Sequence, residues 1–121
     1  MAKIVRVYRN DCQLYNEYYE VNGKRQGIYK LFNFDKNIEQ ILNYVNDKRN
    51  GLSLTYYRNN DIKIISNYIY GKRFGDFKEY YSGGKIYCIS KYNNDLFTGE
   101  YEKYDRQGNV IFYHSDYDVD S

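Results

Sequence analysis

A seven-residue segment recurs along this chain at a constant interval of 24 residues. Its copies are VNGKRQG at 21–27, VNDKRNG at 45–51, IYGKRFG at 69–75 and a weaker NNDLFTG at 93–99. Every copy ends in glycine, at Gly27, Gly51, Gly75 and Gly99. Self-similarity at a fixed period is typical of repeat proteins, in which each unit packs mainly against its sequence neighbours. The repeat therefore constrains the fold more than any other feature of the chain.

Two columns keep their character when the chain is cut into 24-residue units that start at Lys3, Gly27, Gly51, Gly75 and Gly99. The sixth position is always aromatic: Tyr8, Phe32, Tyr56, Tyr80 and Tyr104. The twelfth position is always aliphatic: Leu14, Ile38, Ile62, Ile86 and Val110. Aromatic and β-branched residues favour strands. We expect the sixth-position rings to stack as a ladder along the sheet, with each cross-strand pair contributing about 0.2–1 kcal/mol.

Turn-forming residues interrupt the chain every ten to twelve positions, as in YSGGK at 81–85 and RQGN at 106–109. This spacing suits strands of roughly six to eight residues and leaves no room for ordinary helices. The sequence predicts one β-hairpin per unit and about 4.5 units in a single domain over residues 1–121. The expected fold is all-β, an elongated and twisted antiparallel meander of about nine or ten strands.

Hydrophobic residues also recur three apart, as at Ile38, Ile41 and Tyr44, which would fit an amphipathic helix. A helix is disfavoured because Asn, Gly and Asp interrupt each run, and Ile and Tyr are mediocre helix formers. A β-bulge adds one residue to a strand and re-aims its side chains. We therefore predict a bulge in the second strand of each unit.

The 121 residues include 18 basic and 16 acidic side chains, so the net charge of +2 indicates no particular partner. The chain has no run of about 18 apolar residues, and the segment MAKIVRVYRND lacks the apolar region of a secretory signal. Cys12 and Cys88 lie in unlike contexts, which favours buried structural thiols in a reducing compartment over a disulfide. We expect a cytoplasmic protein.

The sequence shows no catalytic constellation, and we expect neither an enzyme nor a cofactor. His114 is the only histidine, so a metal cluster built on histidines is excluded. HSDYD at 114–118 contains Ser, His and Asp but no nucleophile elbow. The acidic residues Asp116, Asp118 and Asp120 lack the glycine turn of a calcium loop, which favours a solvated tail.

Lys-Arg pairs occupy the same two columns in three successive units, at Lys24 and Arg25, Lys48 and Arg49, and Lys72 and Arg73. We expect them to form a basic ridge along one margin of the sheet. With the eighteenth-position tyrosines they make up the candidate partner-binding residues, which adds Tyr44, Tyr68 and Tyr92. Two interpretations stay open: charged turns that keep a flat sheet soluble, and a docking strip for phosphate or carboxylate groups.

Charge is distributed unevenly along the chain. Residues 1–74 hold 13 basic and 7 acidic side chains, whereas residues 75–121 hold 5 basic and 9 acidic ones. Complementary fields of this kind steer association. Self-association and recognition of a charged partner are both compatible with this polarity.

The segment GDFKEYYSGGKIYCISKYNNDLFTGEYEKY, residues 75–104, resembles the MORN-type repeat (membrane occupation and recognition nexus). It is most similar to the variant repeats of bacterial antitoxin-like proteins. The chain departs from the familiar pattern because it has no tryptophan and keeps the Tyr-x-Gly motif only once, at 81–83. The resemblance implies an elongated, twisted antiparallel sheet. For function it implies protein binding, self-association, contact with acidic phospholipids or antitoxin-like neutralisation.

The leading hypothesis is a non-enzymatic repeat module that binds another protein, for example as an inhibitor or antitoxin-like neutraliser. The chain holds 18 tyrosines, and exposed tyrosine provides a large contact area at low entropic cost. The alternative is a binder of anionic surfaces, phospholipid headgroups or single-stranded nucleic acid, through the basic ridge and its tyrosines. The small net charge weighs against this alternative.

Overall fold

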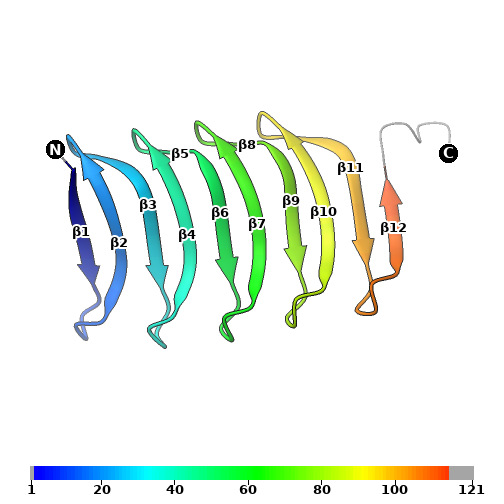
Figure 1. Cartoon of the computed structure of the whole chain (residues 1–121), viewed down its shortest axis with the longest axis horizontal. Coiled ribbons are helices and arrows are strands. Elements are labelled where there is room, and N and C mark those ends of the chain that lie inside the picture. Colours follow the sequence, from blue (N-terminus) through cyan, green and yellow to red (C-terminus); the bar gives the residue numbers. More distant parts are fainter. Residues whose placement is uncertain (1, 115–121) are drawn as a thin grey trace.

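The structure is a computed structural model that describes residues 2–114, and these residues form one open antiparallel sheet with no helix (Figure 1). Ten strands follow one another across the sheet in chain order, and two short strands, β5 and β8, pair with β4 and β7. The strands are β1 (Ala2–Tyr8), β2 (Leu14–Val21), β3 (Lys24–Phe32), β4 (Ile38–Val45), β5 (Lys48–Arg49), β6 (Gly51–Tyr56), β7 (Ile62–Ile69), β8 (Lys72–Arg73), β9 (Gly75–Tyr80), β10 (Ile86–Asn93), β11 (Leu96–Tyr104) and β12 (Val110–His114). The predicted all-β antiparallel meander is confirmed.

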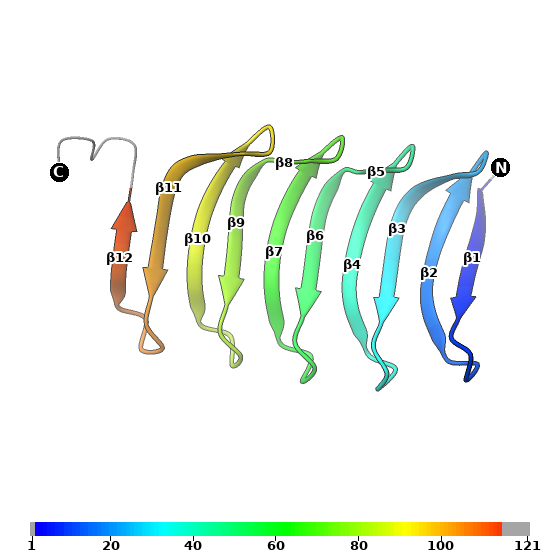
Figure 2. The same cartoon turned by 180° about the vertical axis from the view of Figure 1, so that it is seen from behind.

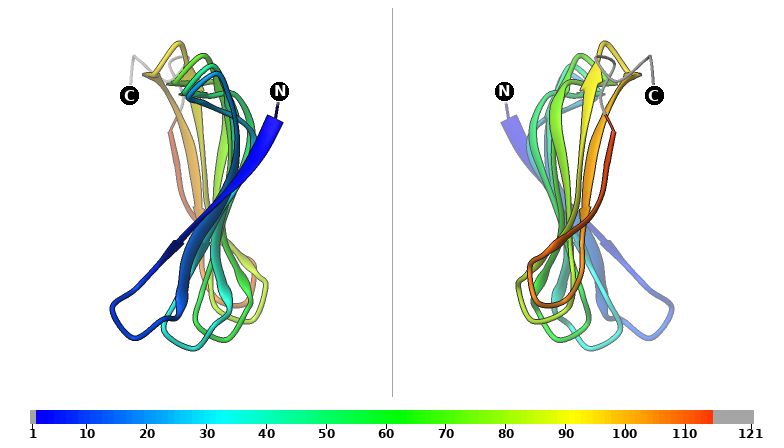
Figure 3. Two further views of the ribbon diagram at one scale, coloured as in Figure 1. Left: turned by 90° about the vertical axis from the view of Figure 1, so that its left-hand side faces the viewer. Right: turned by 90° about the vertical axis from the view of Figure 1, so that its right-hand side faces the viewer.

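Each unit contributes one hairpin, and the strands advance side by side along the long axis of the molecule (Figures 1 and 2). Longer loops join the two strands within a unit at the lower edge of Figure 1, and two-residue turns join successive units at the upper edge. In one such turn, Asn46 and Asp47 have φ values of 48° and 70°. Asn and Asp tolerate this left-handed region, which tight hairpin turns require. Viewed along its long axis, the sheet is clearly twisted (Figure 3).

The predicted bulge is present in the second strand of every unit. Val7 lies opposite Asn16 and Tyr8 lies opposite Leu14, so Tyr15 is an extra residue on β2. The same offset recurs in all five hairpins. The extra residues are Tyr15, Glu39, Lys63, Tyr87 and Ile111. The bulge thereby reconciles the three-residue hydrophobic spacing with a strand.

The sixth-position aromatic residues do not form the predicted ladder of stacked rings. Each lies opposite the twelfth-position aliphatic residue of its own unit, as Tyr8 lies opposite Leu14. Equivalent residues of successive units are two strands apart, about 9–10 Å, which is too far for rings to stack. No ring contact in residues 2–114 joins two sixth-position residues; instead, Tyr18 stacks on Tyr29 at 5.3 Å, and Phe77 meets Tyr92 edge-on at 5.8 Å. The prediction was wrong because it ignored the intervening strand.

The two faces of the sheet carry different side chains, since residues opposite each other in a pair share a face. On one face, which we call the tyrosine face, Tyr18 lies opposite Tyr29, and Tyr29 lies opposite Leu42. The most buried side chains of the described residues all lie on this face: Asn16, Leu42, Tyr44, Ser53, Ser66 and Cys88. On the other face, which we call the aliphatic face, Ile28, Ile41, Leu52, Leu54 and Ile65 lie together on neighbouring strands.

Both cysteines are free, and they differ in burial. Cys88 is buried on the tyrosine face, and this burial raises the pKa of its thiol. Cys12 is exposed, so the prediction of two buried thiols was wrong for this residue. It lies in the loop between β1 and β2 with a φ of 67°, where its side chain has no strand to cover it. Within residues 2–114, no helix is long and apolar enough to span a bilayer.

Leu42 is only 7% exposed, although the sheet has a single layer, because flanking side chains cover it. We expect Leu42→Ala to lower the free energy of unfolding by about 2 kcal/mol, since it removes buried methyl groups and leaves a cavity. Leu96, which is 72% exposed, provides the matched control. Leu96→Ala should change stability by less than about 0.5 kcal/mol. Urea denaturation followed by circular dichroism measures both, and equal losses would contradict this account of the core.

Candidate functional site

The arginine of each Lys-Arg pair lies over a tyrosine ring of the following unit. The distances from the guanidinium carbon to the ring centre are 4.2 Å for Arg25 and Tyr44, 4.0 Å for Arg49 and Tyr68, and 4.3 Å for Arg73 and Tyr92. A cation–π contact of this kind contributes about 0.5–1 kcal/mol when exposed and more when water is excluded. Six of the nine candidate partner-binding residues therefore make contacts that hold successive units together.

The recurring glycine explains how this contact is built. Gly27 lies directly opposite Tyr44, so no side chain from β3 competes for the space beside the ring. Its φ of 92° lies in the left-handed region that glycine adopts readily. At this point Gln26 and Gly27 are extra residues relative to β2, because Tyr18 faces Tyr29 whereas Glu20 faces Arg25. The resulting kink places Arg25, two residues before the glycine, over the same ring.

Two of the three arginines also donate hydrogen bonds to an aspartate in the turn of the next unit. Arg25 donates to Asp47 Oδ1 from its side-chain Nε at 2.7 Å and from its backbone N–H at 3.0 Å. The Asp47 N–H in turn donates to the Arg25 carbonyl at 3.0 Å. Arg73 and Asp95 repeat the arrangement at 2.7, 3.3 and 2.9 Å. We call each set of arginine, tyrosine and aspartate a clasp.

The clasp favours the charged form of its aspartate. The hydrogen bond from the arginine side chain, followed by the bond from the arginine backbone, lowers the pKa of Asp47 and of Asp95. The lysine of the same Lys-Arg pair, Lys24 or Lys72, lowers the pKa of that aspartate further through its charge. The repeated Lys-Arg sequence thus creates a local environment that stabilises a carboxylate.

The middle position departs from this pattern, and we call it the open clasp. Arg49 stacks on Tyr68, but Gly71 occupies the turn position that Asp47 and Asp95 hold in the neighbouring units. The backbone bond is kept, since the Gly71 N–H donates to the Arg49 carbonyl at 2.6 Å. Arg49 Nη2 donates to Ser53 Oγ at 2.8 Å, whereas the buried Arg49 Nε has no hydrogen-bond partner within residues 2–114.

The three lysines lie at the same edge of the sheet as the arginines and are exposed. Neighbouring residues on a strand point to opposite faces, so each lysine projects away from the arginine that follows it. The structure therefore divides the expected ridge: the arginines lie on the tyrosine face, and Lys24, Lys48 and Lys72 project from the opposite side.

The sequence analysis missed the residues that close the clasp. Asp47 and Asp95 belong to turn segments that were interpreted only as boundaries between strands. The signal was available in the alignment of units, because this column reads Gly23, Asp47, Gly71 and Asp95. Ser53, which binds Arg49, carried no signal of its own. Of the acidic tail, Asp116, Asp118 and Asp120 lie outside the described residues.

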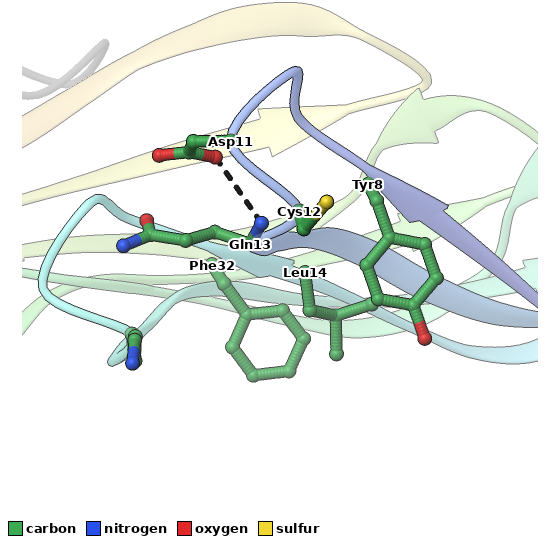
Figure 4. Close-up of a pocket in the computed structure, with 7 residues that line it drawn as sticks. Tyr8, Asp11, Cys12, Gln13, Leu14 and Phe32 are labelled. Atoms are coloured by element: carbon green, nitrogen blue, oxygen red, sulfur yellow. Dashed lines mark hydrogen bonds between the residues drawn. The ribbon is translucent and has the colours of Figure 1, made fainter.

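A separate hollow lies at the lower edge, near the first loop (Figure 4). Apolar side chains of Tyr8, Leu14 and Phe32 line it beside Asp11 and the exposed thiol of Cys12. The Asp11 carboxylate accepts a hydrogen bond from the Gln13 N–H at 3.1 Å, which closes the loop locally. The hollow is thus formed where apolar side chains at the edge of the sheet meet the first loop. The clasps hold more polar contacts than the hollow does, and they remain the stronger candidate site.

No protein-family model, curated protein or solved structure matches this chain in the comparisons with known proteins. The resemblance to MORN-type repeats stays a prediction.

The lowered pKa values predict a specific loss of stability in acid. A group with a lowered folded-state pKa stabilises the fold above its unfolded pKa, about 3.9 for aspartate, and this contribution disappears as the pH falls through the folded value. We expect the double variant Asp47→Asn/Asp95→Asn to be less stable than the parent at pH 7. The difference should shrink as the pH falls through the lowered pKa values, since the carboxylates then become protonated. Urea titrations at decreasing pH test it, and a difference that stays constant in acid would contradict the ionic origin.

Closing the open clasp should stabilise the sheet. Aspartate tolerates the turn conformation, since Asp47 and Asp95 have φ values of 70° and 71° where Gly71 has 86°. A Cβ at Gly71 would meet nothing within 4 Å. Relative to a matched control, we expect Gly71→Asp to gain up to about 1 kcal/mol from the new pair with Arg49.

The control is Gly23→Asp at the equivalent turn position, with a φ of 78° and equal space. Counted back by the same 22 residues that separate Asp47 from Arg25, the sequence position equivalent to the arginine is residue 1, a methionine. Thermal unfolding of both variants measures the difference. Equal stabilities would show that Arg49 does not engage the new carboxylate.

Proposed function

We propose that this chain is a non-enzymatic repeat module that binds another protein through its aliphatic face. The observation that carries the proposal is the exposure of that face in a sheet with one layer across residues 2–114. Ile28 and Leu52 are each 44% exposed, although aliphatic side chains gain free energy when removed from water. Adjacent apolar side chains that nothing covers are typical of interaction surfaces.

The residues of the face form a continuous patch. Ile41 lies opposite Leu54, and Leu54 lies opposite Ile65, so three aliphatic side chains form a row across β4, β6 and β7. Lys30 and Lys78 end this row, because they pair with Ile41 and Ile65 respectively. An apolar centre with charged residues at its margin is the usual anatomy of a protein interface. A partner with an apolar surface and acidic margins fits this face.

The scaffold supports the proposal because it is organised before binding. Each strand of the patch is hydrogen-bonded to a neighbour on both sides. A surface held in this way loses little conformational entropy on association, so more of the contact free energy appears as affinity. Covering a functional surface of the partner would be enough for a role as an inhibitor or antitoxin-like neutraliser. We also propose that the chain is related to MORN-type repeat proteins, and the presence of one hairpin in each 24-residue unit supports this relationship.

Binding of anionic surfaces has less support. That alternative relied on six basic side chains in one ridge, but the three arginines lie on tyrosine rings and two of them also bind aspartates. The exposed lysines and Arg49 Nε are the groups of the ridge that are left to attract phosphate. The salt dependence of binding would reveal such a contribution, because contacts to phosphate weaken steeply as salt rises.

The test compares two exposed leucines. Leu52 lies in the aliphatic patch, whereas Leu96 lies at the start of β11, outside it. In affinity capture from cells of the native host, the parent and Leu96→Lys should retain a stoichiometric protein partner. Leu52→Lys should reduce its recovery at least tenfold, a loss of about 1.4 kcal/mol in binding. Circular dichroism checks that both variants fold.

Two results would contradict the proposal: equal recovery of the partner by both variants, or no partner under several conditions. Light scattering on the purified chain distinguishes a second copy as the occupant of the face, since a dimer that Leu52→Lys dissociates would replace the heterologous partner.

A further inference from the structure

The open clasp differs from its two neighbours by a single side chain. Asp47 places a carboxylate on Arg25, and Asp95 places one on Arg73, with matching Nε to Oδ1 distances of 2.7 Å. At Arg49 the backbone follows the same path, but Gly71 supplies no acceptor. The open clasp at Arg49 thus lies between two clasps that each hold a carboxylate. It has the same backbone arrangement but no carboxylate from its own turn.

Two donors converge at the open clasp. The first is Arg49 Nε, which is buried and has no hydrogen-bond partner in the part of the chain that the structure describes. The second is the Arg49 backbone N–H. Arg49 lies opposite Tyr44, one pair beyond the Val45 and Lys48 pair that closes the hairpin. Backbone groups in alternate pairs of an antiparallel ladder point outward, as the equivalent Arg25 N–H does when it bonds Asp47. The Arg49 N–H therefore points toward Gly71.

The guanidinium that would receive the ligand is held in place before binding. The ring of Tyr68 lies 4.0 Å from the guanidinium carbon, and Ser53 Oγ accepts a bond from Nη2 at 2.8 Å. Ser53 is itself only 3% exposed, which fixes its position. Arginine held by stacking and hydrogen bonding has lost most of its rotamer freedom, so it binds an anion at low additional entropic cost.

Space and charge also favour an anion from outside the chain. A Cβ at Gly71 would meet no heavy atom of the described residues within 4 Å, so the turn leaves room for a group beside Gly71. Lys48 precedes Arg49 and is exposed. The equivalent lysines, Lys24 and Lys72, help to lower the pKa of the aspartates in the two clasps. By the same repeat geometry, Lys48 would favour the ionised form of a carboxylate bound to Arg49.

We propose that the open clasp of Arg49, Tyr68 and Gly71 binds a carboxylate supplied by an aspartate or glutamate side chain of a bound protein. Both donors of a clasp meet on one oxygen, as Arg25 N and Nε do on Asp47 Oδ1, and this geometry suits the planar carboxylate of an acidic side chain. The source of the carboxylate rests on the proposed function, and a partner on the aliphatic face would reach the open clasp around the edge of the sheet that holds the two-residue turns. The site itself is defined by the chain.

Nuclear magnetic resonance of the arginine Nε–H groups tests the site directly. Sodium acetate titrated into the full chain, against sodium chloride at equal ionic strength, should give a saturable shift of the Arg49 Nε–H signal. The signals of Arg25 and Arg73 should shift no more than in chloride, because their own aspartates occupy them. Gly71→Asp should abolish the Arg49 response by supplying an internal carboxylate. Gly23→Asp, the matched control, should leave it unchanged.

Three probes distinguish the sources of the anion. The peptide acetyl-Gly-Asp-Gly-amide presents only a side-chain carboxylate and should compete with acetate. Acetyl-Gly-Gly-Gly presents only a terminal carboxylate, and tighter binding of this peptide would overturn the assignment to an acidic side chain. Inorganic phosphate that displaces acetate at a lower concentration would overturn the assignment to a carboxylate.

The inference is wrong if acetate shifts Arg49 no more than chloride does, or if Gly71→Asp keeps the acetate response. Neither result depends on the aliphatic face, so each leaves the proposed function standing. Conversely, equal capture by the Leu52 and Leu96 variants contradicts the proposed function without affecting the acetate titration.

Discussion

A sheet with one layer has no second layer to pack against, and this constraint governs the whole structure. Stability must come from contacts along the sheet, between side chains of neighbouring strands. The contact of an arginine with the tyrosine of the next unit meets this requirement, because the guanidinium covers a ring and the small residues beside it. Ser53 and Ser66 are only 3% exposed on a face that no other element covers. The long cationic and aromatic side chains therefore cover this face in place of a second layer of secondary structure.

The recurring segment follows from the same requirement. Its second and third residues form a tight turn, its arginine reaches the next unit, and its final glycine faces the tyrosine and kinks the strand, as Gly27 does opposite Tyr44. The turn, the arginine and the glycine of the motif thus serve the joint between units. The two faces differ for this reason. The tyrosine face holds the contacts between units, whereas the side chains of the aliphatic face do not make these contacts and stay exposed.

Period and alternation were enough to predict the meander, the single hairpin per unit and the bulge, because these depend on local spacing. The prediction of a stacked ladder at the sixth position was wrong. Equivalent residues of successive units are separated by an intervening strand, so the neighbour of Tyr8 is Leu14. The Lys-Arg columns were recognised, but strand alternation was not applied to them, so the placement of Arg25 and Lys24 on opposite faces was missed. Asp47 was missed because turn residues were treated as punctuation, although a turn in one unit lies beside the arginine of the preceding one.

Repetition offers an internal comparison in which each unit serves as a reference for the others. Where the units agree, geometry explains the residue, as it does for the glycine opposite each tyrosine. Where one unit departs while its backbone stays the same, the fold does not require the change. Gly71 is such a departure, because the turn keeps its bond to the Arg49 carbonyl and Asp47 shows that a carboxylate fits there. The middle of the chain gives up a stabilising pair and retains the arginine that would make it, and this leaves Arg49 Nε without a hydrogen-bond partner among the described residues.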